Sequence, residues 1–99
     1  MTSPFIAALT FTGTISKSLA AAIQNISRDP IKLLASGENF ALIGLVAEGP
    51  ASELRNQMIQ ACTGFKEILV FQPGDWSTLP GTTSHGWLSR KLGSPGKHL

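Results

Sequence analysis

Few side chains in this 99-residue sequence have the chemistry of a catalytic or metal site. The two histidines, His85 and His98, both lie near the C-terminal end, and the single cysteine is Cys62. A nucleophile–base pair would require one of these histidines to meet Cys62 or a serine, and no spacing in the sequence supports such a pair. One cysteine excludes an internal disulfide and a cysteine-based zinc cluster. Two separated histidines do not form the convergent ligand set that zinc needs. We therefore expect neither a metal nor a cofactor.

The carboxylates are scattered in the same way. The glutamates are Glu38, Glu48, Glu53 and Glu67. They fall in expected turns, helix starts and strand ends, where solvated surface charges are common. No two of them are placed to act together as a general acid and a general base. The sequence therefore predicts a protein that is not an enzyme and has no catalytic residues.

Two junctions between a strand and a helix are candidate ligand turns. In the later one, AEGPASE (47–53), Pro50 removes a backbone donor and Glu48 and Glu53 place negative charge on both sides. These features disfavour a bound anion, and Glu53 suits the positive end of the helix dipole. We interpret that junction as scaffold.

The earlier junction, FTGTISKS (11–18), is more permissive because it combines a glycine, several hydroxyls and a lysine. A capped turn at the start of a helix explains the same residues. As a ligand turn, its candidate residues are Thr12, Gly13, Thr14 and Ser16.

Composition and charge favour a small globular protein. The chain is 42% hydrophobic and 14% charged, with a net charge of +2. A surface of such low charge suggests that another subunit covers part of it. The sheet residues Phe11, Phe40 and Phe71 are not interleaved with arginines, so we do not expect nucleic-acid binding. The N-terminus lacks the basic region of a signal peptide, and no apolar run approaches the ~20 residues of a membrane span. We expect a cytoplasmic protein without membrane contact.

Hydrophobic periodicity predicts six elements in the order β-α-β-β-α-β. Strands are expected over 5–13, 31–36, 40–47 and 66–73, and helices over 14–27 and 50–65. This order predicts a ferredoxin-like α+β domain at residues 1–74, with a four-stranded antiparallel sheet and both helices on one face. The unbroken apolar run of 40–47 predicts burial on both faces or a central position in the sheet. Gly44 within it predicts either a bulge or a close approach by another backbone.

Each predicted helix has one apolar stripe. In the first helix the stripe is Ile15, Leu19, Ile23 and Ile26. In the second it is Leu54, Met58, Ala61 or Cys62, and Phe65. This spacing places each set on one side of a helix, where it packs on the sheet.

Residues 75–99 change in character, because Pro, Gly, Ser and Thr dominate and the excess positive charge lies there. One interpretation is a flexible basic tail. The other is that HGWLSRKL (85–92) packs on its own domain or on a neighbouring subunit. Trp76 and Trp87 support the second interpretation, because large aromatics are scarce in disordered segments. They are the residues through which we would expect contact with partner proteins.

The pattern FIAALTFTG, SLAAAIQ, IKLLASGENFALIGLVAEGPASELRNQMIQAC and KEILVFQP resembles the shell-protein domain of bacterial microcompartments. The resemblance runs from Pro4 to Pro73. It implies a non-enzymatic, self-assembling homo-oligomer that forms a ring, with related shell proteins as further partners. In that family the hairpin loop matched by Ser36, Gly37, Glu38 and Asn39 lines a pore and sets which metabolites pass. Arg28 is the only basic residue where the family commonly has a lysine.

The same pattern is similar to ACT-type regulatory domains. There the turn matched by Gly13 to Ile15 leads into the first helix, and paired domains bind amino acids at their interface. This similarity implies a dimeric sensor of a small molecule in place of an assembly subunit. Both alternatives remain open from the sequence, and a third is a small ferredoxin-like adaptor that fits neither family.

Overall fold

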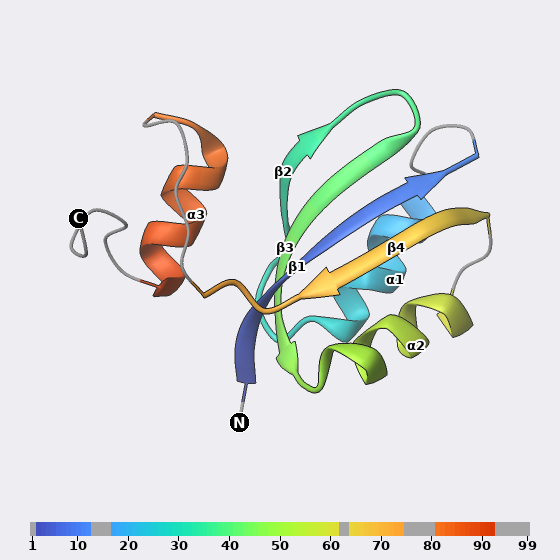
Figure 1. The fold of residues 1–99 in the computed structure, drawn as a ribbon, viewed down its shortest axis with the longest axis horizontal. Coiled ribbons are helices and arrows are strands. Elements are labelled where there is room, and N and C mark those ends of the chain that lie inside the picture. Colours follow the sequence, from blue (N-terminus) through green and yellow to red (C-terminus); the bar gives the residue numbers. More distant parts are fainter. Residues whose placement is uncertain (1, 13–16, 62–63, 75–80, 93–99) are drawn as a thin grey trace.

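The computed structural model of the chain describes residues 2–12, 17–61, 64–74 and 81–92. Figure 1 shows the elements of these ranges: β1 (Thr2–Phe11), α1 (Lys17–Ile26), β2 (Lys32–Ser36), β3 (Phe40–Glu48), α2 (Ala51–Ala61), β4 (Phe65–Phe71) and α3 (Thr83–Leu92). The strands form one antiparallel sheet in the order β2-β3-β1-β4. The predicted α+β class and the four-stranded antiparallel sheet are confirmed. The described residues hold three helices, one more than the two that were predicted.

The main core lies between the sheet and the pair α1 and α2. Alternate residues of β1 and β3 point toward these helices, as the two-residue period of a strand requires. The buried members are Phe5, Ala7, Leu9, Phe11, Leu19, Ile23, Ala41, Ile43, Leu45, Ala47, Leu54 and Met58. The predicted helical stripes are therefore confirmed at Leu19, Ile23, Leu54 and Met58, whereas Ile15 and Cys62 lie outside the described residues.

A second, smaller core lies on the opposite face of the sheet, beneath α3. It consists of Ile6, Leu34, Trp87 and Leu88, with Leu42 packed against it. The two predicted helices, α1 and α2, lie on one face of the sheet, and α3, which was not predicted as a helix, covers part of the other face. Of the two interpretations of the C-terminal stretch, residues 83–92 follow the one in which a segment packs on its own domain.

Local sequence explains why α3 forms. Thr82 caps its first turn, since its hydroxyl accepts a hydrogen bond from the His85 N–H (3.2 Å) and its carbonyl accepts one from Gly86 (3.2 Å). Arg90 and Lys91 stand in the last turn, where positive charge suits the helix dipole.

Gly44 of β3 lets α3 approach the sheet closely. A Cβ added at Gly44 would lie 2.7 Å from Cε2 of Trp87, a separation too short for two carbon atoms. A close approach to Gly44 is observed, but the approaching group is a side chain, the indole of Trp87, and not the backbone that was predicted. β3 lies inside the sheet between β2 and β1, as predicted, and its residues 43–47 are buried, whereas Phe40 is 46% exposed.

The boundary between α2 and β4 differs from the prediction. Phe65 was expected on the inner stripe of the helix, but it is the first residue of β4. Gly64 stands directly before Phe65 with a φ of +96°, a left-handed conformation that glycine adopts readily and that does not belong to a right-handed helix. At the other end of α2, the carbonyl of Pro50 accepts the first helical bonds from Glu53 (3.1 Å) and Leu54 (3.3 Å). Pro50 therefore precedes the first helical position instead of occupying it.

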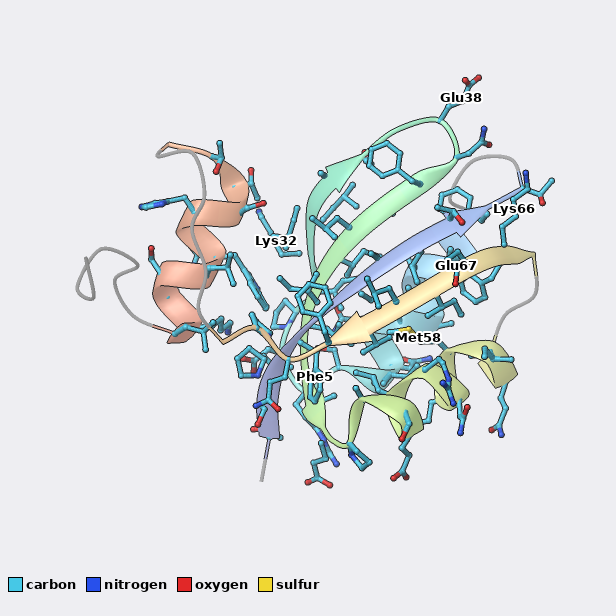
Figure 2. The ribbon with its side chains drawn as sticks, in the orientation of Figure 1. Phe5, Lys32, Glu38, Met58, Lys66 and Glu67 are labelled. Carbon is cyan, nitrogen blue, oxygen red and sulfur yellow. The ribbon has the colours of Figure 1, made fainter. Side chains whose placement is uncertain are left out.

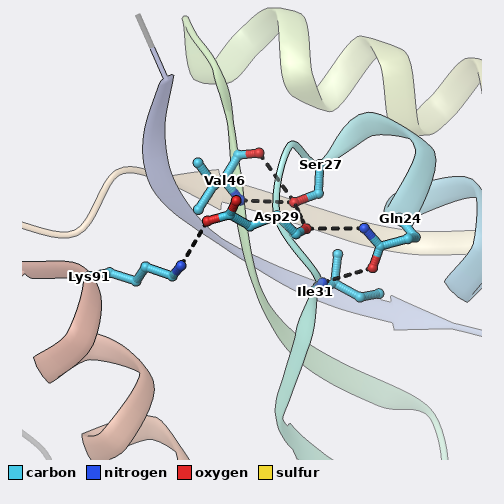
Figure 3. Close-up of polar contacts among 6 residues, drawn as sticks. All are labelled: Gln24, Ser27, Asp29, Ile31, Val46 and Lys91. Carbon is cyan, nitrogen blue, oxygen red and sulfur yellow. Dashed lines mark hydrogen bonds and ion pairs between the residues drawn. The ribbon is translucent and has the colours of Figure 1, made fainter.

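The turn that follows α1 takes the place of a strand beside the end of β3. Pairing of β2 with β3 stops at Lys32 and Gly44, so Val46 has no β2 partner. Figure 3 shows the replacement: the Ser27 hydroxyl accepts a hydrogen bond from the Val46 N–H (3.1 Å) and lies 2.7 Å from the Asp29 carbonyl, to which it donates. The Arg28 N–H donates to the Val46 carbonyl (2.6 Å). Both backbone groups of Val46 are thus satisfied by the turn.

We predict that Ser27→Ala destabilises the fold by about 1–3 kcal/mol, because it leaves the N–H of buried Val46 without an acceptor. Chemical denaturation measures the change in the free energy of unfolding. Gln24→Ala is the matched control. The Gln24 amide also bridges this turn, binding the Asp29 carbonyl (3.1 Å) and the Ile31 N–H (2.8 Å), but it is exposed and water can replace it. An equal loss in the two variants would contradict this account of the turn.

Candidate functional site

The four residues predicted to line a pore form the turn between β2 and β3. Ser36, Gly37, Glu38 and Asn39 are all exposed. The Gly37 N–H donates to the Phe40 carbonyl (3.0 Å), which closes a tight hairpin. In Figure 2, Glu38 stands at the tip of this hairpin and points away from the sheet. The loop is therefore accessible to a ligand or to another subunit.

The alternative ligand turn lies at the same end of the sheet. Thr12 is exposed, whereas Gly13, Thr14 and Ser16 lie outside the described residues. The N–H of Phe11 donates to the Asn39 carbonyl (3.0 Å), and that of Thr12 donates to the Gly64 carbonyl (3.1 Å). The structure thus brings the hairpin, the end of β1 and the start of β4 together, although the sequence treated the hairpin and the β1 turn as rival sites.

The described residues form no cluster of side chains suited to acid–base or metal chemistry. No group of three or more His, Cys, Asp and Glu side chains gathers there to hold a metal ion. Glu48 forms an exposed ion pair with Arg28 (3.8 Å), and such pairs contribute at most about 1 kcal/mol. Asp29 forms a partly buried ion pair with Lys91 (2.8 Å), which joins α3 to the turn after α1.

A groove of about 440 Å³ runs between α2 and the outer edge of β4. Arg55 and Ile59 line it from α2, and residues 64–68 line it from β4 and the turn before it. Ile59 is 51% exposed and stands beside the other apolar groups of the groove. Among the described strands β4 pairs only with β1, so this side of the described sheet ends in an unpaired edge.

The opposite edge of the sheet has a projecting apolar side chain. Leu33 of β2 is 47% exposed, and its neighbour Lys32 is exposed as well. Leu33 pairs with Ile43 and therefore lies on the face of α1 and α2, whereas Lys32 pairs with Gly44 and lies on the face of α3. The sequence did not show that Leu33 would be exposed and Leu34 buried, because both are leucines in a short apolar strand.

Alternation along β2 decides which of the two leucines is buried. Leu34 lies on the same face as Lys32 and turns into the small core beneath α3. Leu33 lies on the other face, at the outer edge of the sheet, and is 47% exposed. β2 is irregular between Leu33 and Ala35, so Leu34 has no direct partner on β3.

The sheet face beside α3 is partly uncovered. Leu69 is 57% exposed, Phe40 46% and Phe71 39%. The remaining aromatic of this predicted set, Phe11, is buried in the main core. Of the two predicted partner residues, Trp87 is 2% exposed in its own domain, and Trp76 lies outside the described residues.

None of the three helices has the length and apolar character of a membrane span, as far as the described residues extend. Comparison of the chain with protein-family models, with curated proteins and with solved structures gave no match.

Proposed function

We propose that this chain is a non-enzymatic structural protein that assembles from identical subunits into a ring, in the manner of microcompartment shell proteins. The observation that supports it best is the pair of apolar edges. Leu33 projects from the β2 edge, and the groove with exposed Ile59 lies along the β4 edge. Exposed apolar side chains at two opposite edges suit a surface that other subunits cover.

The arrangement of the first six elements supports a ferredoxin-like domain within this proposal. Each of the three neighbouring pairs in the order β2-β3-β1-β4 is antiparallel, and α1 and α2 pack together on one face. This is the sheet expected from two strand-helix-strand units joined by a hairpin. Such a domain leaves the β2 and β4 edges open on opposite sides.

Two different edges on one chain favour a ring over a two-fold dimer. A two-fold contact uses the same surface in both subunits, whereas contact between unlike surfaces repeats from subunit to subunit until the assembly closes or becomes a filament. In the ring that we propose, the exposed hairpin of residues 36–39 lines the opening, and Glu38 at its tip selects among small metabolites by charge.

The alternative function is that of an ACT-like regulatory domain, which binds an amino acid at a dimer interface. Two observations favour it. The groove beside β4 opens at an unpaired edge, where a partner subunit would form its missing wall. Thr12, one of the candidate ligand residues, is exposed at the same end of the sheet.

Negative-stain electron microscopy, together with thermal denaturation in the presence of single amino acids, separates the two functions. The structural proposal predicts closed particles of one subunit number and a melting temperature that no amino acid raises. A dimer whose melting temperature rises with one amino acid would overturn the structural proposal in favour of the ACT-like function.

A further inference from the structure

We propose that Leu33 of one subunit inserts into the groove between α2 and β4 of the next, with Lys32 of the first subunit paired to Glu67 of the second. This inference rests on the proposed function and names the contact through which the subunits join. Its partner is a second copy of this chain. The contact is between unlike surfaces, so each subunit offers Leu33 at one edge and a groove at the other.

Shape and polarity support the first half of the contact. Leu33 is a single apolar side chain, half exposed at the border of β2. The groove is concave, and its apolar lining comes from Ile59, Phe65 and Ile68. Phe65 and Ile68 also pack against the main core, so they lie on the α1 and α2 face of the sheet. Leu33 lies on that same face, so the two surfaces meet when neighbouring sheets face the same way.

Charge supports the second half. Lys32 directly precedes Leu33, and Glu67 lines the groove. Lys32 lies opposite Gly44, and Glu67 lies opposite Thr10, which places both on the α3 face. Lys32 and Glu67 lie on the two edge strands of the sheet, with β3 and β1 between them (Figure 2). No ion pair involves either residue in the part of the chain that the structure describes.

One alignment of two subunits satisfies both contacts. β2 runs parallel to β1, and β4 runs antiparallel to it, so β2 of one copy is antiparallel to β4 of a copy that faces the same way. With Lys32 opposite Glu67, the antiparallel order places Leu33 opposite Lys66, which lines the groove. The register that forms the ion pair therefore brings Leu33 to the groove.

Side chains, more than backbone pairing, would hold this contact. Both edges are irregular at the point of contact, because β2 shifts register at Leu34 and the pairing of β4 shifts between Thr10 and Phe11, which leaves Lys66 without a partner on β1. Bulges and lysines on edge strands discourage indiscriminate strand pairing. A specific side-chain contact can form at such an edge, although backbone pairing with unrelated strands is disfavoured there.

A mixing experiment tests the contact between unlike edges. Leu33→Asp removes the projecting side chain but keeps the groove, and Ile59→Asp spoils the groove but keeps Leu33. Both positions are about half exposed, so both variants should fold, which circular dichroism checks. We expect each variant alone to have the monomer mass of 10.5 kDa by light scattering. An equimolar mixture at about 300 µM, above the micromolar dissociation constants of weak interfaces, should reach twice that mass and no more.

The mixture stops at a dimer because Leu33 of the Ile59→Asp variant binds the groove of the Leu33→Asp variant. The two edges that remain free in this dimer carry the substitutions and cannot bind a further chain. Leu69→Asp is the matched control, since Leu69 is an equally exposed leucine that lies outside the groove. It should leave the wild-type assembly intact. If the wild-type chain assembled but the mixture of the two variants stayed monomeric, this contact would be overturned and the proposed function would stand. A wild-type chain that is itself monomeric would overturn both.

Charge reversal tests the ion pair separately. Glu67→Lys should weaken assembly about two- to fivefold, the effect of an exposed ion pair, and Lys32→Glu in the same chain should restore it. Failure of the second substitution to restore assembly would contradict the pairing of Lys32 with Glu67.

Discussion

Phe5→Ala should destabilise the protein by about 3–5 kcal/mol, the loss expected when a buried phenylalanine is truncated in a core that cannot collapse around the space. Phe5 is 2% exposed and lies opposite Leu45 on β3. A Cβ added at Gly49 would lie 3.2 Å from Cζ of Phe5, so the ring reaches the segment that leads into α2. Truncation therefore removes contacts from the sheet and from the start of that helix at once.

Urea denaturation at low protein concentration measures this loss. In a domain of this size the melting temperature should fall by more than about 12 °C. Phe71→Ala is the matched control, because Phe71 is also a phenylalanine on a strand but is 39% exposed on the other face. Its truncation should cost about 1 kcal/mol or less. If the two variants lost equal stability, Phe5 would not be at the centre of the main core.

Trp87→Ala should release α3 while the rest of the sheet stays folded. Trp87 and Leu88 are the buried side chains of α3, and Trp87 packs directly over Gly44. A ten-residue helix is marginal in water without tertiary contacts. Loss of about 3 kcal/mol of packing should raise the hydrogen-exchange rate of α3 amides about 100-fold. Amides of β1 and β3 should stay protected, because they bond within the sheet.

Two further variants make this result specific. Gly44→Ala disrupts the same contact from the β3 side, because the added Cβ would displace the indole of Trp87. It should therefore also raise the hydrogen-exchange rate of the α3 amides. Leu92→Ala is the control on the same helix, because Leu92 is 37% exposed and should change exchange little. Unchanged exchange in Gly44→Ala would show that Trp87 over Gly44 does not hold α3 in place.

Much of the scaffold could be predicted because its signals are local. The spacing of four that joins Leu19 and Ile23 predicts the buried side of α1, and the apolar run of residues 40–47 predicts an interior strand. Gly44 indicated a close approach, although by a backbone and not by a side chain. The approaching group could not be named, because Trp87 lies far along the chain in a segment rich in helix-breaking residues.

The candidate assembly surfaces were less predictable for a physical reason. Exposure at an edge depends on which elements cover each face, and Leu33 is 47% exposed although its neighbour Leu34 is buried beneath α3. The groove depends on where β4 begins, and Phe65 is the first residue of that strand. Hydrophobic periodicity, the property that the sequence reveals best, fixes neither of these. The hairpin of residues 36–39 was predicted as a turn because its residue types favour a turn through local interactions, whatever the position of the hairpin in the fold.

The molar mass of the wild-type chain in solution tests the central claim most directly. Light scattering after size exclusion should give one assembly whose mass is a fixed multiple of 10.5 kDa and larger than a dimer, and Leu33→Asp should reduce it to a single chain. A wild-type mass of 10.5 kDa at all concentrations up to about 300 µM, where even weak interfaces form, would contradict assembly through the β2 and β4 edges.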